Sequence, residues 1–101
     1  MPEFIEAARV DQIPPGAGMT VNVAGKEVAI FNVDGEVYAI GDSCPHAGAS
    51  LGSGKLSGRI VTCRAHGLRY DVTTGLVTTG GFGSPSYPVK VVDGKILIAV
   101  G

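Results

Sequence analysis

Two short segments of metal-binding residue types constrain this chain more than any other feature. Its only two cysteines and its only two histidines lie in Cys44-Pro45-His46 and in Cys63-Arg64-Ala65-His66, and sixteen residues separate these segments. Thiolates and imidazoles are the protein ligands that zinc and iron accept most readily. The spacing therefore predicts a fold in which two separate loops meet and each loop offers one thiolate and one imidazole.

The four residues by themselves leave several chemistries open. Zinc binds two thiolates and two imidazoles, but its common sites place the cysteines on one element and the histidines on another. A disulfide would use the two cysteines and leave both histidines without a role, and a Cys-His nucleophile is a further alternative. The mixed pairs suit a binuclear [2Fe-2S] centre in which one iron takes both thiolates and the other takes both imidazoles.

The residues around these segments follow a longer pattern. It consists of Cys44–Leu51, Gly54-Lys55-Leu56, Ile60–Cys63, His66–Asp71, Thr74-Gly75 and Pro85. This framing resembles the Rieske-type [2Fe-2S] family, and the length of 101 residues resembles the stand-alone ferredoxins of that family. The resemblance implies one [2Fe-2S] cluster, with Cys44 and Cys63 on one iron and His46 and His66 on the other.

The same resemblance implies the domain organisation. We expect a single domain over residues 1–101, in which three antiparallel sheets stack and a smaller lobe carries the cluster-binding loops, at about residues 43–71. A segment at about residues 80–86, containing Phe82 and Pro85, is expected to cover the cluster and exclude water.

Alternating apolar residues predict an all-β fold independently of the resemblance. Valines and isoleucines recur in short segments over residues 21–23, 28–33 and 37–40, and these segments are separated by Ala24-Gly25 and Asp34-Gly35. Asp-Gly is a strong hairpin signal because both residues tolerate positive φ. No segment shows the sustained period of 3.6 residues that indicates a helix.

A second Asp-Gly pair predicts a hairpin at the end of the chain. Asp93-Gly94 lies between Val89–Val92 and Lys95–Val100, which both read as strands. The alternation predicts that Val89, Val91, Ile96 and Ile98 point into the core.

Departures from the Rieske pattern predict a low reduction potential. High-potential members carry an extra cysteine in each loop, joined by a disulfide, where this chain has Ala49 and Ala65. They also carry a serine that donates a hydrogen bond to the cluster, where this chain has Leu68. The potential should therefore lie toward the lower end of the Rieske range of roughly −150 to +300 mV. Tyr70 is either a donor to a cysteine sulfur or an ordinary core aromatic.

Composition excludes several classes of function. A chain of 10.3 kDa leaves no room for a second, substrate-oxidising domain. The net charge of −1 and the absence of a basic stripe argue against nucleic-acid binding. We expect neither a signal peptide nor a membrane span, because the first residues have neither a positively charged region nor an apolar region, and two thiols committed to a cluster fit a reducing cytoplasm.

The resemblance implies a soluble, monomeric, cytoplasmic one-electron carrier and not an enzyme. It would take electrons from an NAD(P)H-dependent flavin reductase and pass them to a terminal Rieske oxygenase or a related monooxygenase. Two alternatives remain: a small Rieske-like subunit of an enzyme complex such as assimilatory nitrite reductase, and a zinc-stabilised binding module.

Overall fold

The computed structural model describes residues 4–42, 51–52, 54–63, 69–78, 83 and 85–99. Over these residues the regular structure is β, apart from one 3-10 turn, η1 (Val10–Gln12). Nowhere in this described part does a helix reach the length and apolar character that crossing a membrane requires.

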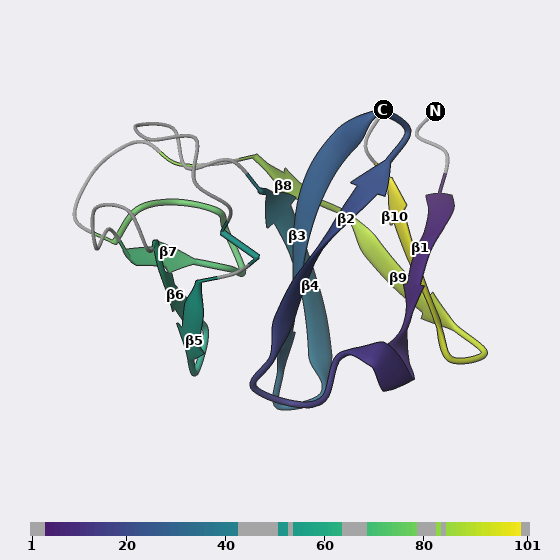
Figure 1. Ribbon diagram of the computed structural model, residues 1–101, viewed down its shortest axis with the longest axis horizontal. Helices are drawn as coiled ribbons and strands as arrows, with labels where there is room; N and C mark the ends of the chain where they lie inside the picture. The colour runs from purple at the N-terminus through teal and green to yellow at the C-terminus, as the bar shows by residue number, and fades with distance from the viewer. Residues whose placement is uncertain are drawn as a thin grey trace.

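Three antiparallel sheets make up the fold (Figure 1). The first has the order β1-β10-β9, from β1 (Phe4–Arg9), β10 (Lys95–Ala99) and β9 (Val89–Val92). The second has the order β2-β3-β4-β8, from β2 (Gly18–Val23), β3 (Lys26–Val33), β4 (Glu36–Gly41) and β8 (Ser86–Tyr87). The third has the order β5-β6-β7, from β5 (Lys55–Ser57), β6 (Ile60–Thr62) and β7 (Arg69–Asp71). The prediction of an all-β stack of three antiparallel sheets is confirmed.

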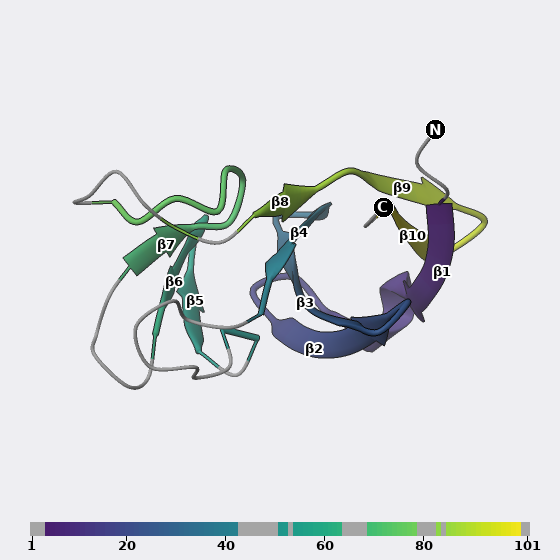
Figure 2. The ribbon, with the colours of Figure 1, turned by 90° about the horizontal axis from the view of Figure 1, so that it is seen from above.

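The third sheet forms a smaller lobe at one end of the molecule. Figure 2 shows the first two sheets curving around a common interior, while β5, β6 and β7 lie beyond β4 and β8. The chain leaves the second sheet after β4, builds the third sheet, and returns to the second sheet at β8. The third sheet is thus an insertion between two paired strands.

The predicted hairpin turns are present. Both residues of Asp34-Gly35 have positive φ, at 52° and 95°, as do both residues of Asp93-Gly94, at 51° and 75°. Two-residue hairpins with positive φ at both positions match the right-handed twist of the strands they join. The flanking residues pair directly, Val33 with Glu36 and Val92 with Lys95, so each turn fixes the register of its hairpin.

One core fills the space between the first two sheets. Val28 and Ile30 of β3 and Ile96 and Ile98 of β10 are fully buried there. The prediction for Val91 is wrong, because half of this residue is exposed. Val91 lies opposite Ile96 and therefore on the inward face, but β9 is one of the two outer strands of its sheet.

A second core joins the second sheet to the third. Phe31 of β3 and Ile40 of β4 pack in one buried cluster with Val61 of β6 and Tyr70 of β7. Alternate residues of β3 therefore serve different cores, Val28 and Ile30 on one face and Phe31 on the other. This strand is buried on both sides and holds the three sheets in one stack.

Hydrogen bonds at Asp42 close the segment that follows β4. The Leu51 amide donates to the Asp42 carbonyl at 2.7 Å, and the Gly52 amide donates to Asp42 Oδ1 at 2.8 Å. Thr20 Oγ1 of β2 donates to the same carboxylate oxygen at 2.8 Å. Asp42, directly after β4, and Leu51 are thus held side by side.

Two further pairings close later segments in the same way. Thr62 of β6 pairs with Arg69 of β7, on either side of residues 63–68. An isolated bridge joins Leu76 to Gly83, and the Thr78 amide donates to the Arg69 carbonyl at 2.9 Å. Described backbone pairings therefore fix both ends of each of these connections.

We predict that Asp42→Ala destabilises the protein by about 2 kcal/mol, because it leaves the buried Gly52 amide and the Thr20 hydroxyl without their acceptor. For a domain of this size, that loss lowers the midpoint of thermal unfolding by about 8–16 °C. Asp42→Asn retains an acceptor oxygen and should restore most of the difference. Circular dichroism during heating measures the midpoint.

Asp11→Ala is the matched control, because the Asp11 side chain is 72% exposed and its one ion pair among the described residues is with the exposed Arg9. Its midpoint should change by no more than about 4 °C, because surface substitutions usually change stability by less than about 0.5 kcal/mol. An equal fall for the Asp11 and Asp42 variants would show that the hydrogen bonds at Asp42 do not hold this part of the fold.

Candidate metal centre

Cys63 is the one predicted metal ligand that lies within the described residues. It follows directly after β6, its residue is 1% exposed, and its thiol is free of any disulfide. Side chains alternate along a strand, so Cys63 continues the inward face of Val61, while Thr62 points to the opposite face. The period of β6 therefore places the thiol in the core at the point where the strand ends.

The Cys63 thiol belongs to the core that joins the second and third sheets. Its apolar neighbours in this cluster include Leu51, Tyr70, Val72 and Val77, all buried. An apolar shell around a metal ligand limits the access of water and lowers the local dielectric constant. These surroundings fit a thiolate that holds a buried metal centre.

Tyr70 occupies a central position in this shell. It is fully buried and pairs across the sheet with Val61, and both share the face that carries Cys63. Its packing role in the core is therefore established. A hydrogen bond from its hydroxyl to a cysteine sulfur stays a prediction.

The two sequence segments with ligand residues both border this core. Leu51 ends the longer motif Cys44–Leu51 that contains the first segment, and Cys63 begins the second segment. The two residues lie in the same buried cluster although they are twelve positions apart in the sequence. The Asp42 hydrogen bonds hold Leu51 in place, and the β6–β7 pairing holds Cys63. The described structure thus brings Leu51 and Cys63 together in one core, as a site shared by the two segments requires.

The other predicted ligands, Cys44, His46 and His66, lie outside the described residues. So do Ala49, Arg64, Ala65, Leu68 and Phe82. Of the expected covering segment at residues 80–86, the structure describes only residues 83, 85 and 86, and Pro85 is exposed. Among the described residues, no three Cys, His, Asp or Glu side chains gather into a metal site. The complete ligand set remains a prediction.

Sequence reasoning missed Asp42 as a residue that positions the site. It is 2% exposed although it carries a carboxylate, and it lies two residues before Cys44. Buried carboxylates in proteins are almost always paired or hydrogen-bonded. The position of Asp42 directly after the apolar strand β4 is the sequence signal that could have indicated a buried carboxylate that accepts hydrogen bonds.

A family model for the Rieske [2Fe-2S] domain matches residues 3–88. The ferredoxin component of the naphthalene 1,2-dioxygenase/salicylate 5-hydroxylase systems of Ralstonia sp. is 39% identical over 94% of this chain and 93% of its own length. The biphenyl dioxygenase ferredoxin subunit of Pseudomonas sp. (strain KKS102) is 38% identical over 94% of this chain and 90% of its own length.

Solved structures agree with these relatives. The ferredoxin of carbazole 1,9a-dioxygenase from Nocardioides aromaticivorans IC177 superposes with a TM-score of 0.89 at 33% identity, over 95% of this chain and 96% of its own. A chain in a complex of reduced oxygenase and oxidized ferredoxin of carbazole 1,9a-dioxygenase gives 0.86 at 28% identity, over 95% of this chain and 92% of its own.

A nitrite reductase neighbour shares the same fold. The putative NADH-dependent nitrite reductase small subunit from Mycobacterium tuberculosis gives a TM-score of 0.89 at 28% identity, over 98% of this chain and 96% of its own. The fold alone thus does not separate the two kinds of protein, whereas the relatives with higher sequence identity are ferredoxin components. The match over residues 3–88 and the relatives at 39% and 38% identity decide among the metal chemistries that the four residues left open: this chain belongs to the Rieske [2Fe-2S] family and carries a Rieske-type [2Fe-2S] cluster.

Proposed function

We propose that this chain is the ferredoxin of a multicomponent oxygenase system and passes single electrons from a reductase to a terminal oxygenase. The observation that carries the proposal is the buried Cys63 thiol, placed at the end of β6 in a chain that is 39% identical to such a ferredoxin component. A similar ferredoxin is present in a complex with the oxygenase of carbazole 1,9a-dioxygenase. The chain is then an electron-transfer component and has no organic substrate of its own.

The proposed ligands are Cys44 and Cys63 for one iron and His46 and His66 for the other. Cys63 supports this assignment by its burial, its free thiol and its position at a strand end. The sequence offers no other cysteine or histidine to take the place of any of the four. The single domain over residues 1–101 belongs to the same proposal, and the two cores that meet on β3 support it.

The chain's own residues protect and tune the site. When bound, the cluster supplies one-electron redox chemistry between ferric and ferrous iron. Leu51, Tyr70, Val72 and Val77 exclude water from the Cys63 side of the site. Because the positions matching the extra cysteines and the serine of high-potential members hold Ala49, Ala65 and Leu68, we propose a low reduction potential.

The partners and the location complete the proposal. We infer an NAD(P)H-dependent flavin reductase as the electron donor, a monomeric state and a cytoplasmic location. A permanent subunit of a nitrite reductase is the alternative of similar fold. A ferredoxin should be stable and monomeric when it is expressed alone, whereas a permanent subunit should be unstable or oligomeric.

We predict that the purified protein absorbs visible light and bleaches on reduction with dithionite. The reduced sample should give the EPR signal of a histidine-ligated [2Fe-2S] cluster, with a low average g value. A redox titration should yield a negative midpoint potential, toward the lower end of the range of roughly −150 to +300 mV. A midpoint well above zero would contradict the low-potential assignment.

Substitution of any proposed ligand should remove the cluster. Cys44→Ala, Cys63→Ala, His46→Ala and His66→Ala should each retain less than about a tenth of the iron and acid-labile sulfide of the wild type, because each substitution removes one of the two protein ligands of one iron. Thr62→Val is the matched control, since Thr62 neighbours Cys63 but points to the opposite face of β6. A histidine variant with full iron content and an unchanged EPR signal would exclude that histidine from the ligand set.

Reconstitution tests the carrier role. The reductase and oxygenase of the Ralstonia naphthalene 1,2-dioxygenase system are mixed with NADH and naphthalene, with this chain in place of their own ferredoxin. We expect product at about a tenth of the cognate rate or more, because partner surfaces differ between systems, and none with Cys63→Ala. If the reductase leaves the wild-type chain oxidised and no product forms, the carrier role is contradicted.

A further inference from the structure

The third sheet has one buried face and one open face. Lys55 pairs with Thr62, Thr62 pairs with Arg69, and Ser57 pairs with Ile60. Residues directly opposite each other in antiparallel strands share a face of the sheet. Ile60 also pairs with Asp71, so these six side chains lie together on the face opposite Val61 and Tyr70. We call it the open face.

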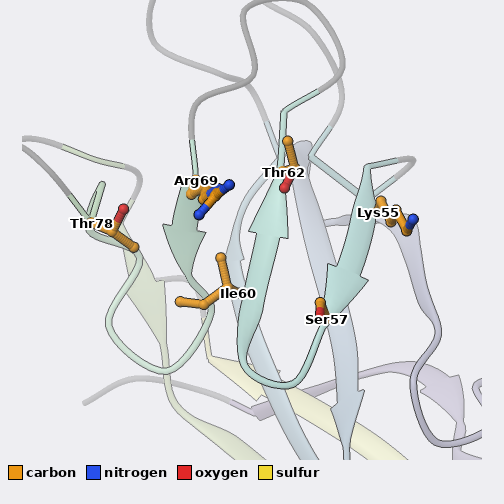
Figure 3. Close-up of a pocket in the computed structure, with 6 residues that line it drawn as sticks. All are labelled: Lys55, Ser57, Ile60, Thr62, Arg69 and Thr78. Carbon is orange, nitrogen blue, oxygen red and sulfur yellow. The ribbon is translucent and has the colours of Figure 1, made fainter.

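A shallow groove of about 540 Å³ runs over the open face. Its lining residues are Lys55, Ser57, Ile60, Thr62, Arg69 and Thr78. Figure 3 shows Lys55 and Arg69 on the two outer strands, with Thr62 between them on β6. The groove thus combines two cations with three hydroxyl groups and contains no carboxylate in its lining.

The two cations of the groove are available to a partner. Both Lys55 and Arg69 are exposed, and neither forms an ion pair with any residue in the described ranges. The nearby carboxylate of Asp71 is engaged by Arg59 at 3.3 Å and by the backbone amide of Thr73 at 2.9 Å. Asp71, which lies on the same face, is therefore paired with Arg59, whereas Lys55 and Arg69 have no ion pair within the described ranges.

Charge is distributed unevenly between the two ends of the molecule. The described residues from 54 to 78 carry three cationic side chains and one carboxylate. The described residues of the other two sheets and their turns carry four cationic side chains and seven carboxylates. The small lobe is therefore positive, although the whole chain has a net charge of −1.

We propose that the open face of the third sheet docks an acidic surface of a redox partner protein, with Lys55 and Arg69 as its charged contacts. This proposal rests on the carrier function proposed above and adds the chemistry of the partner. A three-stranded face with a cation on each outer strand fits a protein surface better than a single small anion. Complementary charge across such a contact mainly increases the rate of association.

The open face is also close to the redox site along the chain. Thr62 lies in the groove, and Cys63, the next residue, points into the core that holds the proposed cluster. One strand position separates them, which is a rise of about 3.3 Å. A partner docked on this face would therefore approach the electron-carrying centre from beside β6.

The test compares two double variants that remove the same amount of charge. Lys55→Gln with Arg69→Gln neutralises the open face, and Lys90→Gln with Lys95→Gln neutralises two cations on β9 and β10 in the first sheet. Stopped-flow spectroscopy follows electron transfer from each dithionite-reduced protein to cytochrome b5, an acidic haem protein, and to cytochrome c, a basic one. Ionic strength is varied from about 20 to about 300 mM to screen the charges.

We expect the open-face variant to react about fivefold more slowly than the wild type with cytochrome b5 at low ionic strength, with a weaker salt dependence. Its rate with cytochrome c should not fall. The Lys90 and Lys95 variant should stay within about twofold of the wild type with both probes. Equal effects of the two double variants, or an unchanged open-face variant, would overturn the proposal.

Further readouts separate this proposal from the carrier function and from other occupants of the groove. Absorbance, EPR and transfer to ferricyanide should be unchanged in both variants, and a wild type that transfers no electrons to any acceptor would refute the carrier function itself. Wild-type self-association at low salt that the open-face variant abolishes, seen by analytical ultracentrifugation, would assign the face to a second copy of the chain. Saturable binding of inorganic phosphate, lost in that variant while the cytochrome b5 rates stay equal, would assign it to a free anion. Either result would overturn the proposal.

Discussion

The burial of strand β3 on both of its faces is the constraint on which the rest of the structure depends. Its alternate side chains enter two different cores, one shared with the first sheet and one shared with the third. Val28, Ala29, Ile30 and Phe31 are all fully buried in consequence. A strand of this kind reads as a continuous apolar run instead of an alternation, and it joins the small lobe to the body of the molecule through direct packing.

The second of these cores connects the fold to the redox site. It contains Leu51, which ends the first motif segment, and Cys63, which begins the second. The hydrogen bonds of Asp42 and the pairing of Thr62 with Arg69 fix the ends of these segments on rigid strands. Sites held by strand ends and supported by hydrogen bonds of their own keep their geometry better than sites on free loops.

Strand β6 serves the two surfaces of the small lobe at once. Because side chains alternate with a period of two, Val61 and Cys63 face the core while Ile60 and Thr62 face the groove. The same short strand therefore leads to the buried Cys63 thiol on one face and contributes Ile60 and Thr62 to the cationic open face on the other. The burial of the Cys63 thiol and the place of Thr62 on the proposed docking face both follow from the alternation of side chains along β6.

Much of the fold and the identity of the site chemistry could be predicted from the sequence. The Asp-Gly pairs determined the hairpins, because positive φ at two adjacent residues is a local requirement that these residue types satisfy. The pairing of cysteine with histidine in each segment, with the surrounding pattern, led to the Rieske family. All four ligand assignments rest on that pattern, and Cys63 is the one of the four residues that the structure describes.

Other features were decided only by the tertiary structure. Val91 has the right period for a core residue, yet it is half exposed on one of the two outer strands of its sheet, and strand order is not a local property. The partners of Asp42 come from β2 and from beyond the first motif segment, so no local pattern could name them. The sequence by itself determined the turns, the strand periods and the ligand types, because each depends on neighbouring residues. Which strands lie at the edges of the sheets, which buried groups form hydrogen bonds and which face stays open depend on how the strands pair. Contacts between residues far apart in the sequence decide this pairing.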